Sequence, residues 1–356
     1  MSTPTPPLEW IDEHIRIIDQ TLLPGELRML DITTAAAAID AISRLAIRGA
    51  PALGAFGSLA IVVGLDESHP DAVADAIPVL ERLRIDIGDA RPTAVNLRWA
   101  VDRVIDHALA SAPDSVAALR QLLLDEALAV SAEDAAACAE IGRLGRELLH
   151  DAINIGTHCN AGRLATAGIG TALAPMYAKA DAGEPIRAFA SETRPLLQGA
   201  RLTAWELHDA GIDVTVVPDG AMASTILSGA LDAYIVGADR IAANGDAANK
   251  IGTVAHALAA KEAGIPFYVA APTTTIDASL ATGAEIDIEQ RDPNEVHQIR
   301  SERLTPHGVK ASNPAFDVTP HRLITAIITE AGVLHPPYGK SIRAALAHAS
   351  PEAEGS

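Results

Sequence analysis

The feature that most constrains the fold is an alternation of short apolar runs with helix-length segments, which begins at about residue 152. The runs are AINIGT, IRAFAS, IDVTVVP, AYIVG and IPFYVAAP. Several of the intervening segments end at a glycine just before the next run (Gly183, Gly211 and Gly264), as is usual for the residue that follows a helix. This pattern predicts strands joined by crossover helices, and therefore a parallel sheet of the α/β class.

Polar residues follow each of these runs. In open parallel sheets, ligands bind outside the carboxyl ends of the strands. The residues found at those ends are His158-Cys159-Asn160, Glu192-Thr193-Arg194, Asp219, Asp239-Arg240 and Thr273-Thr274-Thr275. We therefore expect a functional site at this edge of the sheet.

The first half of the chain has the pattern of Ala-rich amphipathic helices. In TAVNLRWAVDRVIDHALA the apolar residues Val95, Trp99, Val101, Ile105 and Leu109 fall near a helical period. Farther on, Ser131 and Asp134 have the spacing of a capping box and predict a helix start. We predict a mainly helical domain over 1–148, an α/β catalytic domain over 149–345 and, because HASPEAEGS is polar and aperiodic, a disordered tail over 346–356.

Composition excludes several classes of protein. The formal charge of −19 argues against nucleic acid or an anionic membrane as partner, since both require a basic surface. No long uninterrupted apolar run and no signal-peptide pattern occur, so we expect a cytoplasmic protein. The two cysteines and the histidines lack metal-ligand spacing, and GIGTALAP lacks the third glycine of a dinucleotide loop, so neither a metal nor a nucleotide cofactor is expected.

Cys159 and Asp239 are the candidate catalytic residues. Cys159 precedes NAGRLATAG, which we interpret as a helix start whose amides would lower the thiol pKa and favour a base or nucleophile. Asp239 follows a buried strand, where apolar surroundings would raise its pKa and suit a general acid. It could equally pair with Arg240 or cap a helix. Cys138 lies in an Ala-rich helix and is interpreted as a core residue.

Other residues are candidates for anion or sugar binding. Asn249-Lys250 are expected to open a helix and so to form an anion site. Arg48 and Arg91 are candidate phosphate ligands or salt-bridge partners, and Gly49 would allow close approach of the backbone. Gln198 and Arg201 could bind a sugar hydroxyl or simply cover a helix face, while Asn244 and Asp246 are typical of a turn.

Nine sequence blocks together resemble the 5-methylthioribose-1-phosphate isomerases, a family related to the regulatory alpha, beta and delta subunits of eukaryotic translation initiation factor 2B. The blocks span about residues 17 to 333. They are IDQTLLP, RGAPALG, RPTAVNLRWAV, THCNAGRLATAGIGTAL, ETRPLLQGARLTAWEL, VGADRIAANGDAANKIGT, PFYVAAPTTTID, IEQRDPNEV and NPAFDVTPHRLITAIITEAGV. Small departures from the family pattern occur at Leu144, at Thr274 and, in IDIEQR, at Asp287 and Gln290.

This resemblance implies a fold, an activity and a set of site residues. It implies a helical N-terminal domain and a Rossmann-like C-terminal domain, usually in a homodimer. The implied reaction is the isomerisation of 5-methylthioribose 1-phosphate to 5-methylthioribulose 1-phosphate in methionine salvage, without a cofactor. Cys159 and Asp239 match the catalytic positions, and the positions that match substrate-binding residues are Arg48, Gly49, Ala50, Arg91, Gln198, Asn249 and Lys250.

Two other interpretations stay open at this point. The chain could be a ribose 1,5-bisphosphate or 5-deoxyribose 1-phosphate isomerase, since the same chemistry would serve either substrate. It could also be a non-catalytic, sugar-phosphate-binding regulatory subunit. The presence of both Cys159 and Asp239 favours an enzyme, and the shortage of basic residues near the expected site favours an apolar group on C5 of the sugar.

Overall fold

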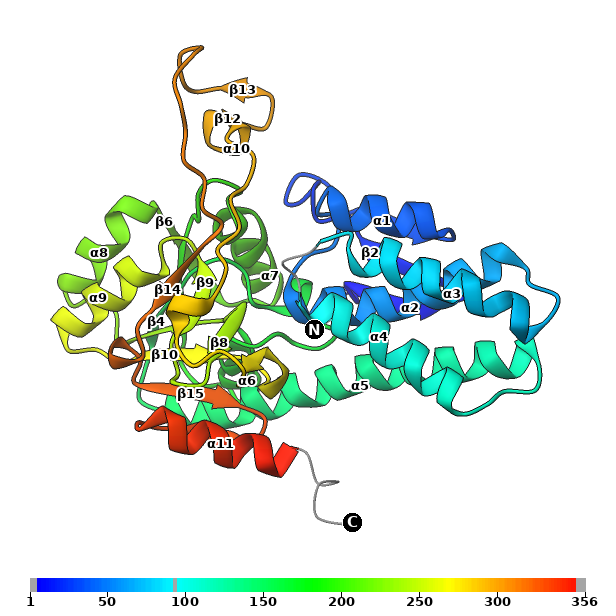
Figure 1. Cartoon of the computed structure of the whole chain (residues 1–356). Helices are drawn as coiled ribbons and strands as arrows, with labels where there is room; N and C mark the ends of the chain where they lie inside the picture. Colours follow the sequence, from blue (N-terminus) through cyan, green and yellow to red (C-terminus); the bar gives the residue numbers. More distant parts are fainter. Residues whose placement is uncertain (1–4, 92–94, 350–356) are drawn as a thin grey trace. The chain divides into compact units, whose positions relative to one another are not determined.

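The computed structural model describes residues 5–91 and 95–349, and these residues form two compact units (Figure 1). Unit 1 contains residues 1–138 together with 162–170, and unit 2 contains residues 139–161 and 171–356. Each unit is described separately below.

Unit 1 combines a small antiparallel sheet with helices. The sheet has the order β1-β2-β3 and is formed by Leu8–Ile11, His14–Ile18 and Met29–Ile32. The helices are α1 (Ala35–Ser43), α2 (Ala50–Ser68), α3 (Val73–Gly88), α4 (Val95–Ala110) and the first part of α5 (Val116–Leu148). A short 3-10 turn, Arg163–Ala165, also belongs to this unit.

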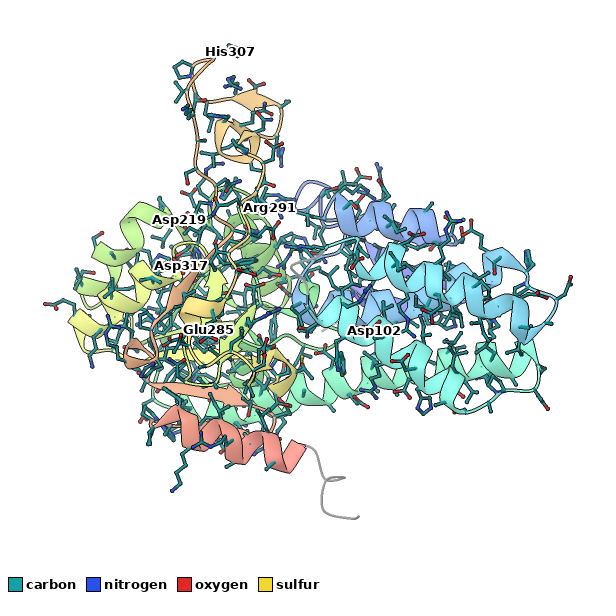
Figure 2. All side chains as sticks on the ribbon, in the orientation of Figure 1. Asp102, Asp219, Glu285, Arg291, His307 and Asp317 are labelled. Atoms are coloured by element: carbon teal, nitrogen blue, oxygen red, sulfur yellow. The ribbon has the colours of Figure 1, made fainter. Side chains whose placement is uncertain are left out.

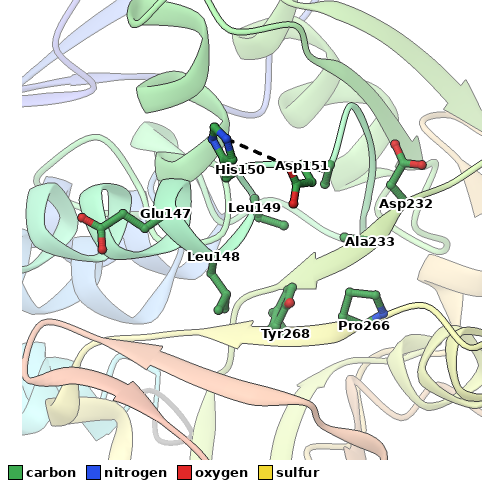
Figure 3. A pocket seen from close by; sticks show the side chains of 10 residues that line it. Glu147, Leu148, Leu149, His150, Asp151, Asp232, Ala233, Pro266 and Tyr268 are labelled. Atoms are coloured by element: carbon green, nitrogen blue, oxygen red, sulfur yellow. Dashed lines mark ion pairs between the residues drawn. The ribbon is translucent and has the colours of Figure 1, made fainter.

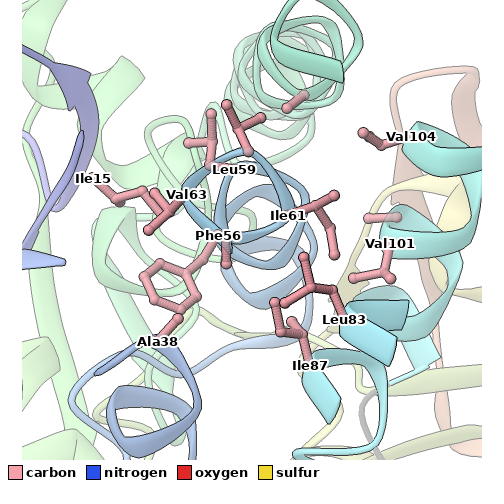
Figure 4. Packing of buried hydrophobic residues seen from close by; sticks show 14 of the residues in the cluster. Ile15, Ala38, Phe56, Leu59, Ile61, Val63, Leu83, Ile87, Val101 and Val104 are labelled. Carbon is pink, nitrogen blue, oxygen red and sulfur yellow. The ribbon is translucent and has the colours of Figure 1, made fainter. Parts of the chain in front are cut away.

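Helix α2 is the centre of unit 1. Phe56, Leu59 and Ile61 on this helix are almost completely buried, and they pack among residues of α1, α3 and α4 (Figure 4). By length and composition alone, this helix could cross a membrane. However, 78% of the tested window is buried inside the protein. Its apolar character is therefore accounted for by core packing.

Unit 2 is built on a seven-stranded sheet whose strands follow the sequence prediction. These are β4 (Asn154–Thr157), β5 (Arg187–Ser191), β6 (Asp213–Val217), β7 (Ala233–Val236), β10 (Phe267–Ala270), β15 (Ala326–Thr329) and β16 (Gly332–Leu334). Their order is β16-β15-β10-β7-β4-β5-β6, with only β16 antiparallel to its neighbour. Without β16, this is the 3-2-1-4-5-6 order of the doubly wound Rossmann fold, so the predicted fold class is confirmed.

Helices cover both faces of this sheet because side chains alternate along buried strands. On β7, Tyr234 and Val236 face a core shared with α8 (Asp219–Leu227), α9 (Thr253–Ala263) and α11 (Tyr338–Ala349). Ala233 and Ile235 face the opposite core, which is shared with the end of α5, α6 (Ala174–Asp181) and α7 (Ala204–Asp209). The glycines after α6, α7 and α9 have the positive φ expected of their positions.

A second sheet and an arm complete unit 2. The sheet has the order β11-β8-β9-β14 and contains Ile276–Asp277, Arg240–Ala242, Ala247–Lys250 and Phe316–Thr319. The arm, residues 286–315, carries α10 (Asn294–His297), β12 (Gln298–Ile299) and β13 (Glu302–Arg303). Figure 2 shows Arg291 near the base of this arm and His307 at its tip. Short 3-10 turns occur at Thr273–Thr275, Gly283–Glu285 and His321–Leu323.

Several predictions for the first half of the chain were wrong in detail. The β1-β2-β3 sheet was missed, because its strands are short and lie between turns. On α4, Val101 and Ile105 are buried as expected, whereas Val95 and Trp99 are 43% and 41% exposed. Leu97, Val104 and Ala108 complete the buried face. Ser131 does not start a helix: it lies inside α5, where its hydroxyl bonds the Ala127 carbonyl.

The compact units also differ from the predicted ranges 1–148 and 149–345. The division falls within α5 rather than at its end, and the segment 162–170 returns to unit 1. The first four residues of the predicted disordered tail, 346–349, belong to helix α11. The remainder of the predicted tail, 350–356, lies outside the described residues, as do residues 92–94 of the RPTAVN block.

Candidate functional site

Cys159 and Asp239 follow the two strands at which the strand order of the large sheet reverses. Cys159 lies two residues after β4, and Asp239 lies three residues after β7. The strands β4 and β7 are hydrogen-bonded to each other. A Cβ placed on Gly237 would lie only 2.9 Å from the Ala161 Cβ, so the loops that carry the two residues pack closely. In doubly wound folds this topological switch point is the usual ligand site.

The surroundings of Cys159 differ from the sequence expectation. No α-helix begins after it: the next regular element is the three-residue 3-10 turn Arg163–Ala165, and α6 begins only at Ala174. The prediction of a thiol activated by a helix start was therefore wrong, because the glycines and small residues of NAGRLATAG form an extended loop. Cys159 instead has a left-handed backbone, with φ of 62°.

Two buried histidines lie beneath this strand edge. His158 bonds the Ile251 carbonyl through Nε2 at 2.8 Å, so Nε2 carries the proton. Burial, with a smaller contribution from the Lys250 ammonium, lowers the pKa of His158 to about 4. Burial and the neighbouring His158 lower the pKa of His256 to about 3. The two rings meet edge to face at 4.8 Å and are neutral at pH 7.

Tyr234 connects the histidine pair to the main chain of the sheet. Its hydroxyl donates to the Thr157 carbonyl at 3.0 Å, and it lies 3.1 Å from both Ser191 Oγ and His256 Nδ1. Because the single phenolic proton is used at Thr157, His256 Nδ1 and Ser191 Oγ act as donors. Burial raises the pKa of Tyr234, so the hydroxyl keeps its proton. The result is a buried polar network directly below the loop of Cys159.

Asn249 and Lys250 do not open a helix, which corrects the prediction for this pair. They end strand β9, whereas α9 begins at Thr253. Neighbouring residues of a strand point to opposite faces. Accordingly, Asn249 Nδ2 bonds Thr253 Oγ1 at 3.1 Å, whereas the Lys250 ammonium lies 4.8 Å from the centroid of the Phe316 ring. Both side chains are at least nine-tenths buried.

The amides at the start of α9 are bonded by an acid of the chain itself. The Asp317 carboxylate accepts from Gly252 N at 2.8 Å and from Val254 N at 3.2 Å. This acid, labelled in Figure 2, lies on β14 opposite Asn249. Burial raises its pKa to about 6 despite the two amide donors. The predicted binding of substrate phosphate by these amides is therefore not supported, and Lys250 is the member of the predicted pair that could bind an anion by its charge.

Gln198 lies at the start of a π-helical turn, Gly199–Thr203, and is 6% exposed. Its side-chain oxygen is buried and has no hydrogen-bond partner among the described residues. The turn approaches β5 so closely that a Cβ on Gly199 would lie 1.6 Å from the Ser191 carbonyl oxygen. Because π-turns often occur at functional sites and buried polar atoms are normally paired, Gln198 is a strong candidate for binding a ligand hydroxyl.

Arg48, Gly49, Ala50 and Arg91 belong to unit 1. Arg48 is 8% exposed, and its Nε donates to Gln20 Oε1 at 3.2 Å, while Gln20 Nε2 donates to the Leu164 carbonyl at 2.7 Å. Gly49 has φ of 95°, and a Cβ there would lie 2.5 Å from the Ala165 carbonyl oxygen. The packing of Gly49 against Ala165 of the same chain therefore explains why this position is a glycine. Ala50 is the first residue of α2, and the half-buried Arg91 directly precedes the undescribed residues 92–94.

Several other polar residues at the strand ends have structural partners. The Asp219 carboxylate accepts the amides of Thr193 and Arg194 at 2.9 and 2.7 Å. Arg194 bonds the Val296 carbonyl, and Arg240 lies 3.4 Å from the Asp277 carboxylate. Thr273 is bonded to Glu330. Arg201 donates to the Leu196 carbonyl at 3.2 Å, and Asn244 and Asp246 form the predicted turn.

Sequence reasoning missed four residues that shape this region: Thr193, Thr203, His256 and Asp317. Thr193 was noted only as part of a strand end, Thr203 and His256 lie in segments expected to be helices, and Asp317 lies in a segment for which no element was predicted. A sequence signal existed only for Thr203, since the block ETRPLLQGARLTAWEL contains a glycine in the middle of an expected helix. Such a glycine commonly has a packing or functional reason.

A cavity of about 240 Å³ lies at the opposite edge of the large sheet (Figure 3). It is lined by the end of α5 and by residues at the beginnings of β7 and β10, including Asp151, Asp232 and Tyr268. It lies at the amino ends of these parallel strands, whereas ligands bind at the carboxyl ends. In addition, the Asp232 carboxylate accepts the amides of Ile153 and Asn154, and the carbonyls of Leu149 and His150 accept from Lys179. The cavity therefore does not compete with the switch point as the candidate site.

No group of three or more His, Cys, Asp and Glu side chains within 5–91 and 95–349 is arranged to hold a metal ion. The chemistry available at the switch point is that of a thiol, a carboxyl group and a buried ammonium. Such a set can move protons and bind an anion.

Comparison with known proteins identifies relatives along almost the whole chain. A curated 5-deoxyribose 1-phosphate isomerase from Moorella thermoacetica is 51% identical over 98% of this chain and 99% of its own. A methylthioribose-1-phosphate isomerase from Desulforudis audaxviator is 49% identical over 96% of this chain and 98% of its own.

Two solved structures share the fold. The 5-methylthioribose 1-phosphate isomerase from Pyrococcus horikoshii OT3 superposes with a TM-score of 0.91 at 38% identity, covering 97% of each chain. A structure from A. fulgidus, described as the delta subunit of translation initiation factor eIF-2B, has a TM-score of 0.87 at 40% identity, covering 96% of this chain and 99% of its own. The model of the initiation factor 2 subunit family matches residues 46–336. The chain therefore belongs to the initiation factor 2 subunit family.

Proposed function

We propose that this protein is an aldose-ketose isomerase that converts 5-methylthioribose 1-phosphate to 5-methylthioribulose 1-phosphate. The observation that carries the proposal is the placement of Cys159 and Asp239 after β4 and β7, the adjacent strands at the switch point of the sheet. The isomerase names of relatives at 51% and 49% identity support the same class of reaction.

The proposed reaction begins with ring opening. A phosphate on C1 prevents the spontaneous opening that free aldoses undergo, so the enzyme has to open the ring itself. Asp239, half-buried beside the apolar end of β7, donates a proton to the ring oxygen.

Transfer from C2 to C1 then follows by one of two routes. In the first, the Cys159 thiolate removes the C2 proton and returns it at C1 through an enolate. In the second, hydride moves directly from C2 to C1, and Cys159 stabilises the transition state. In both routes the C2 hydroxyl becomes the ketone and gives its proton to the Asp239 carboxylate, which restores the acid. The two routes differ in isotope exchange: only the enolate route allows deuterium from solvent to enter the product at C1.

Lys250 is the proposed phosphate ligand of unit 2, because its ammonium is buried near the loop of Cys159, where it also lowers the pKa of His158. The buried, unpaired oxygen of Gln198 is proposed to accept a hydrogen bond from a sugar hydroxyl. Arg48 and Arg91 are proposed as further phosphate ligands. Measurement of KM for the variants Arg48→Lys and Arg91→Lys would test this assignment.

The substituent on C5 separates the candidate substrates. The relative at 51% identity acts, by its name, on 5-deoxyribose 1-phosphate, whose C5 group is a methyl, and this makes that sugar the second candidate. Both candidates have an uncharged C5 group, whereas ribose 1,5-bisphosphate would require a second anion site.

The test is a comparison of ketose formation from all three sugars by the unsubstituted protein, Cys159→Ser and Asp239→Asn. We expect turnover of the methylthio sugar, weaker or comparable turnover of the deoxy sugar, and none of the bisphosphate. Each substitution should lower kcat by roughly 10²- to 10⁴-fold. Sugar-phosphate binding without turnover of any of the three would refute the isomerase and favour a regulatory binding protein.

A further inference from the structure

The backbone of Cys159 has a conformation that its residue type disfavours. Its φ is 62°, and that of Thr193, at the end of the neighbouring strand β5, is 65°. Residues with a Cβ seldom adopt this left-handed region, and they persist there only when the surrounding structure holds them. Two such residues at adjacent strand ends therefore call for a specific set of contacts.

Both backbone polar atoms of Cys159 are bonded to threonine hydroxyls. The Cys159 amide donates to Thr193 Oγ1 at 2.9 Å, and the Cys159 carbonyl accepts from Thr203 Oγ1 at 2.6 Å. Both threonines are completely buried. The main chain is thus held on both sides of the thiol-bearing Cα.

Each hydroxyl has at least one further partner, which decides whether it accepts from Cys159 or donates to it. The Thr193 hydroxyl proton has two acceptors, the Ser191 carbonyl at 3.0 Å and His158 Nδ1 at 3.4 Å, so in either case its oxygen is available to accept from the Cys159 amide. Thr203 Oγ1 accepts from Asn160 Nδ2 at 3.1 Å and so donates to Cys159. The two threonines lie on separate elements, since Thr193 follows β5 and Thr203 ends the π-helical turn that begins beside Gln198.

We propose that Thr193 and Thr203 are positioning residues that clamp the Cys159 peptide and thereby direct its thiol. The proposal rests on the proposed role of Cys159 in isomerisation. It assigns a purpose to the π-helical turn, because the turn brings Thr203 to the Cys159 carbonyl. It also separates two functions of this region: Gln198 is proposed to touch the sugar, whereas the threonines act only through Cys159.

The matched variants are Thr193→Val and Thr203→Val, which remove a hydroxyl at nearly constant volume, and Thr193→Ser and Thr203→Ser, which keep it. We expect each valine variant to lower kcat roughly 10- to 100-fold, as displacement of a reacting group by about 1 Å does, and to change KM by less than about threefold. The serine variants should keep kcat within about threefold of the unsubstituted protein.

A second readout does not depend on any substrate. The rate of alkylation of Cys159 by iodoacetamide, followed against pH with peptide mapping, reports the position and ionisation of the thiol. Cys138, which is 1% exposed, serves as the unreactive internal thiol. The alkylation rate should change by roughly threefold or more in the valine variants and stay close to that of the unsubstituted protein in the serine variants.

The outcomes distinguish this proposal from the proposed function. An alkylation rate that changes in the valine variants but not in the serine variants would support the clamp even if no candidate sugar were turned over. Equal losses of kcat in the valine and serine variants, or unchanged alkylation in all four, would overturn it.

Hydrogen exchange tests the clamp in the unsubstituted chain, which matters if a valine variant does not fold. The Cys159 amide is expected to exchange slowly, like an amide of the sheet. Exchange at the rate of an open loop would overturn the proposal.

Discussion

Acidification should destabilise unit 2 through its two buried histidines. Their pKa values, about 4 for His158 and about 3 for His256, lie well below the usual value of 6.5. Between pH 6.5 and 4 the unfolded chain therefore binds protons that the folded protein does not. The stability that these groups contribute is complete above pH 6.5 and decreases as the pH falls.

The size of the effect follows from the pKa of the unfolded state. At pH 5 both histidines are still neutral in the folded protein, whereas in the unfolded chain their pKa of about 6.5 lies about 1.5 units above the pH. Protonation of the unfolded chain therefore lowers the free energy of unfolding by about 2 kcal/mol per histidine. The pair together should cost about 4 kcal/mol between pH 7 and pH 5.

Asp317 acts in the opposite direction. Its pKa in the folded protein, about 6, lies above its usual value, so the ionised form at pH 7 destabilises the fold. Protonation on acidification restores about 1 kcal/mol between pH 7 and pH 5. The net loss expected from the three groups is therefore about 3 kcal/mol.

The assay is equilibrium unfolding in urea at pH 7 and pH 5, followed by the fluorescence of Trp205, the tryptophan of unit 2. His158→Gln keeps a donor for the Ile251 carbonyl, and His256→Asn keeps a donor for Tyr234. Each variant should remove about 2 kcal/mol of the pH dependence. His335→Gln, at an exposed position, is the matched control and should change nothing.

Equal free energies of unfolding at pH 7 and pH 5 would refute the reasoning, as would a pH dependence that survives in both buried-histidine variants. The first result would mean that water reaches the pair. The second would assign the acid sensitivity to other groups.

Three further substitutions test individual contacts within unit 2. Lys179→Met should lower the free energy of unfolding by about 2–4 kcal/mol in urea titrations, because the buried ammonium bonds the carbonyls of Leu149 and His150 at the end of α5. A loss below about 0.5 kcal/mol would show that these bonds contribute little to stability. Gly199→Ala should destabilise the protein and lower kcat, since its Cβ would collide with the Ser191 carbonyl, whereas Gly220→Ala, with no atom within 4 Å, is the neutral control. Asp317→Asn should remove the opposing contribution of this acid, so that the loss of stability between pH 7 and pH 5 rises from about 3 to about 4 kcal/mol; an unchanged difference between the two pH values would contradict the assignment.

The sequence predicted the part of the molecule that depends on local pattern. The strands that carry Cys159 and Asp239 were located by apolar runs and by glycines at helix ends, because both signals are local. The topological rule for parallel sheets then placed their ends at one edge without any structure. The family assignment, based on motifs in a fixed order, is also confirmed.

The remainder depended on contacts between distant residues. Asn249 and Lys250 precede a helix, but β9 pairs with β14, whose residues come 66 to 72 positions later. This pairing makes the two residues part of a strand and brings Asp317 to the helix start. The clamp on Cys159 is equally remote from local pattern, since its hydroxyls come from positions 34 and 44 residues later. No periodicity encodes such contacts, so only the structure reveals them.

The chain passes between its two units three times, at residues 138–139, 161–162 and 170–171. No single cut in the sequence therefore yields both units intact. A fragment ending at residue 138 would lack Leu164, which accepts from Gln20, and Ala165, against which Gly49 packs. A chain cut at a helix boundary should therefore be insoluble or only partly folded, and the protein has to be studied and engineered as a whole.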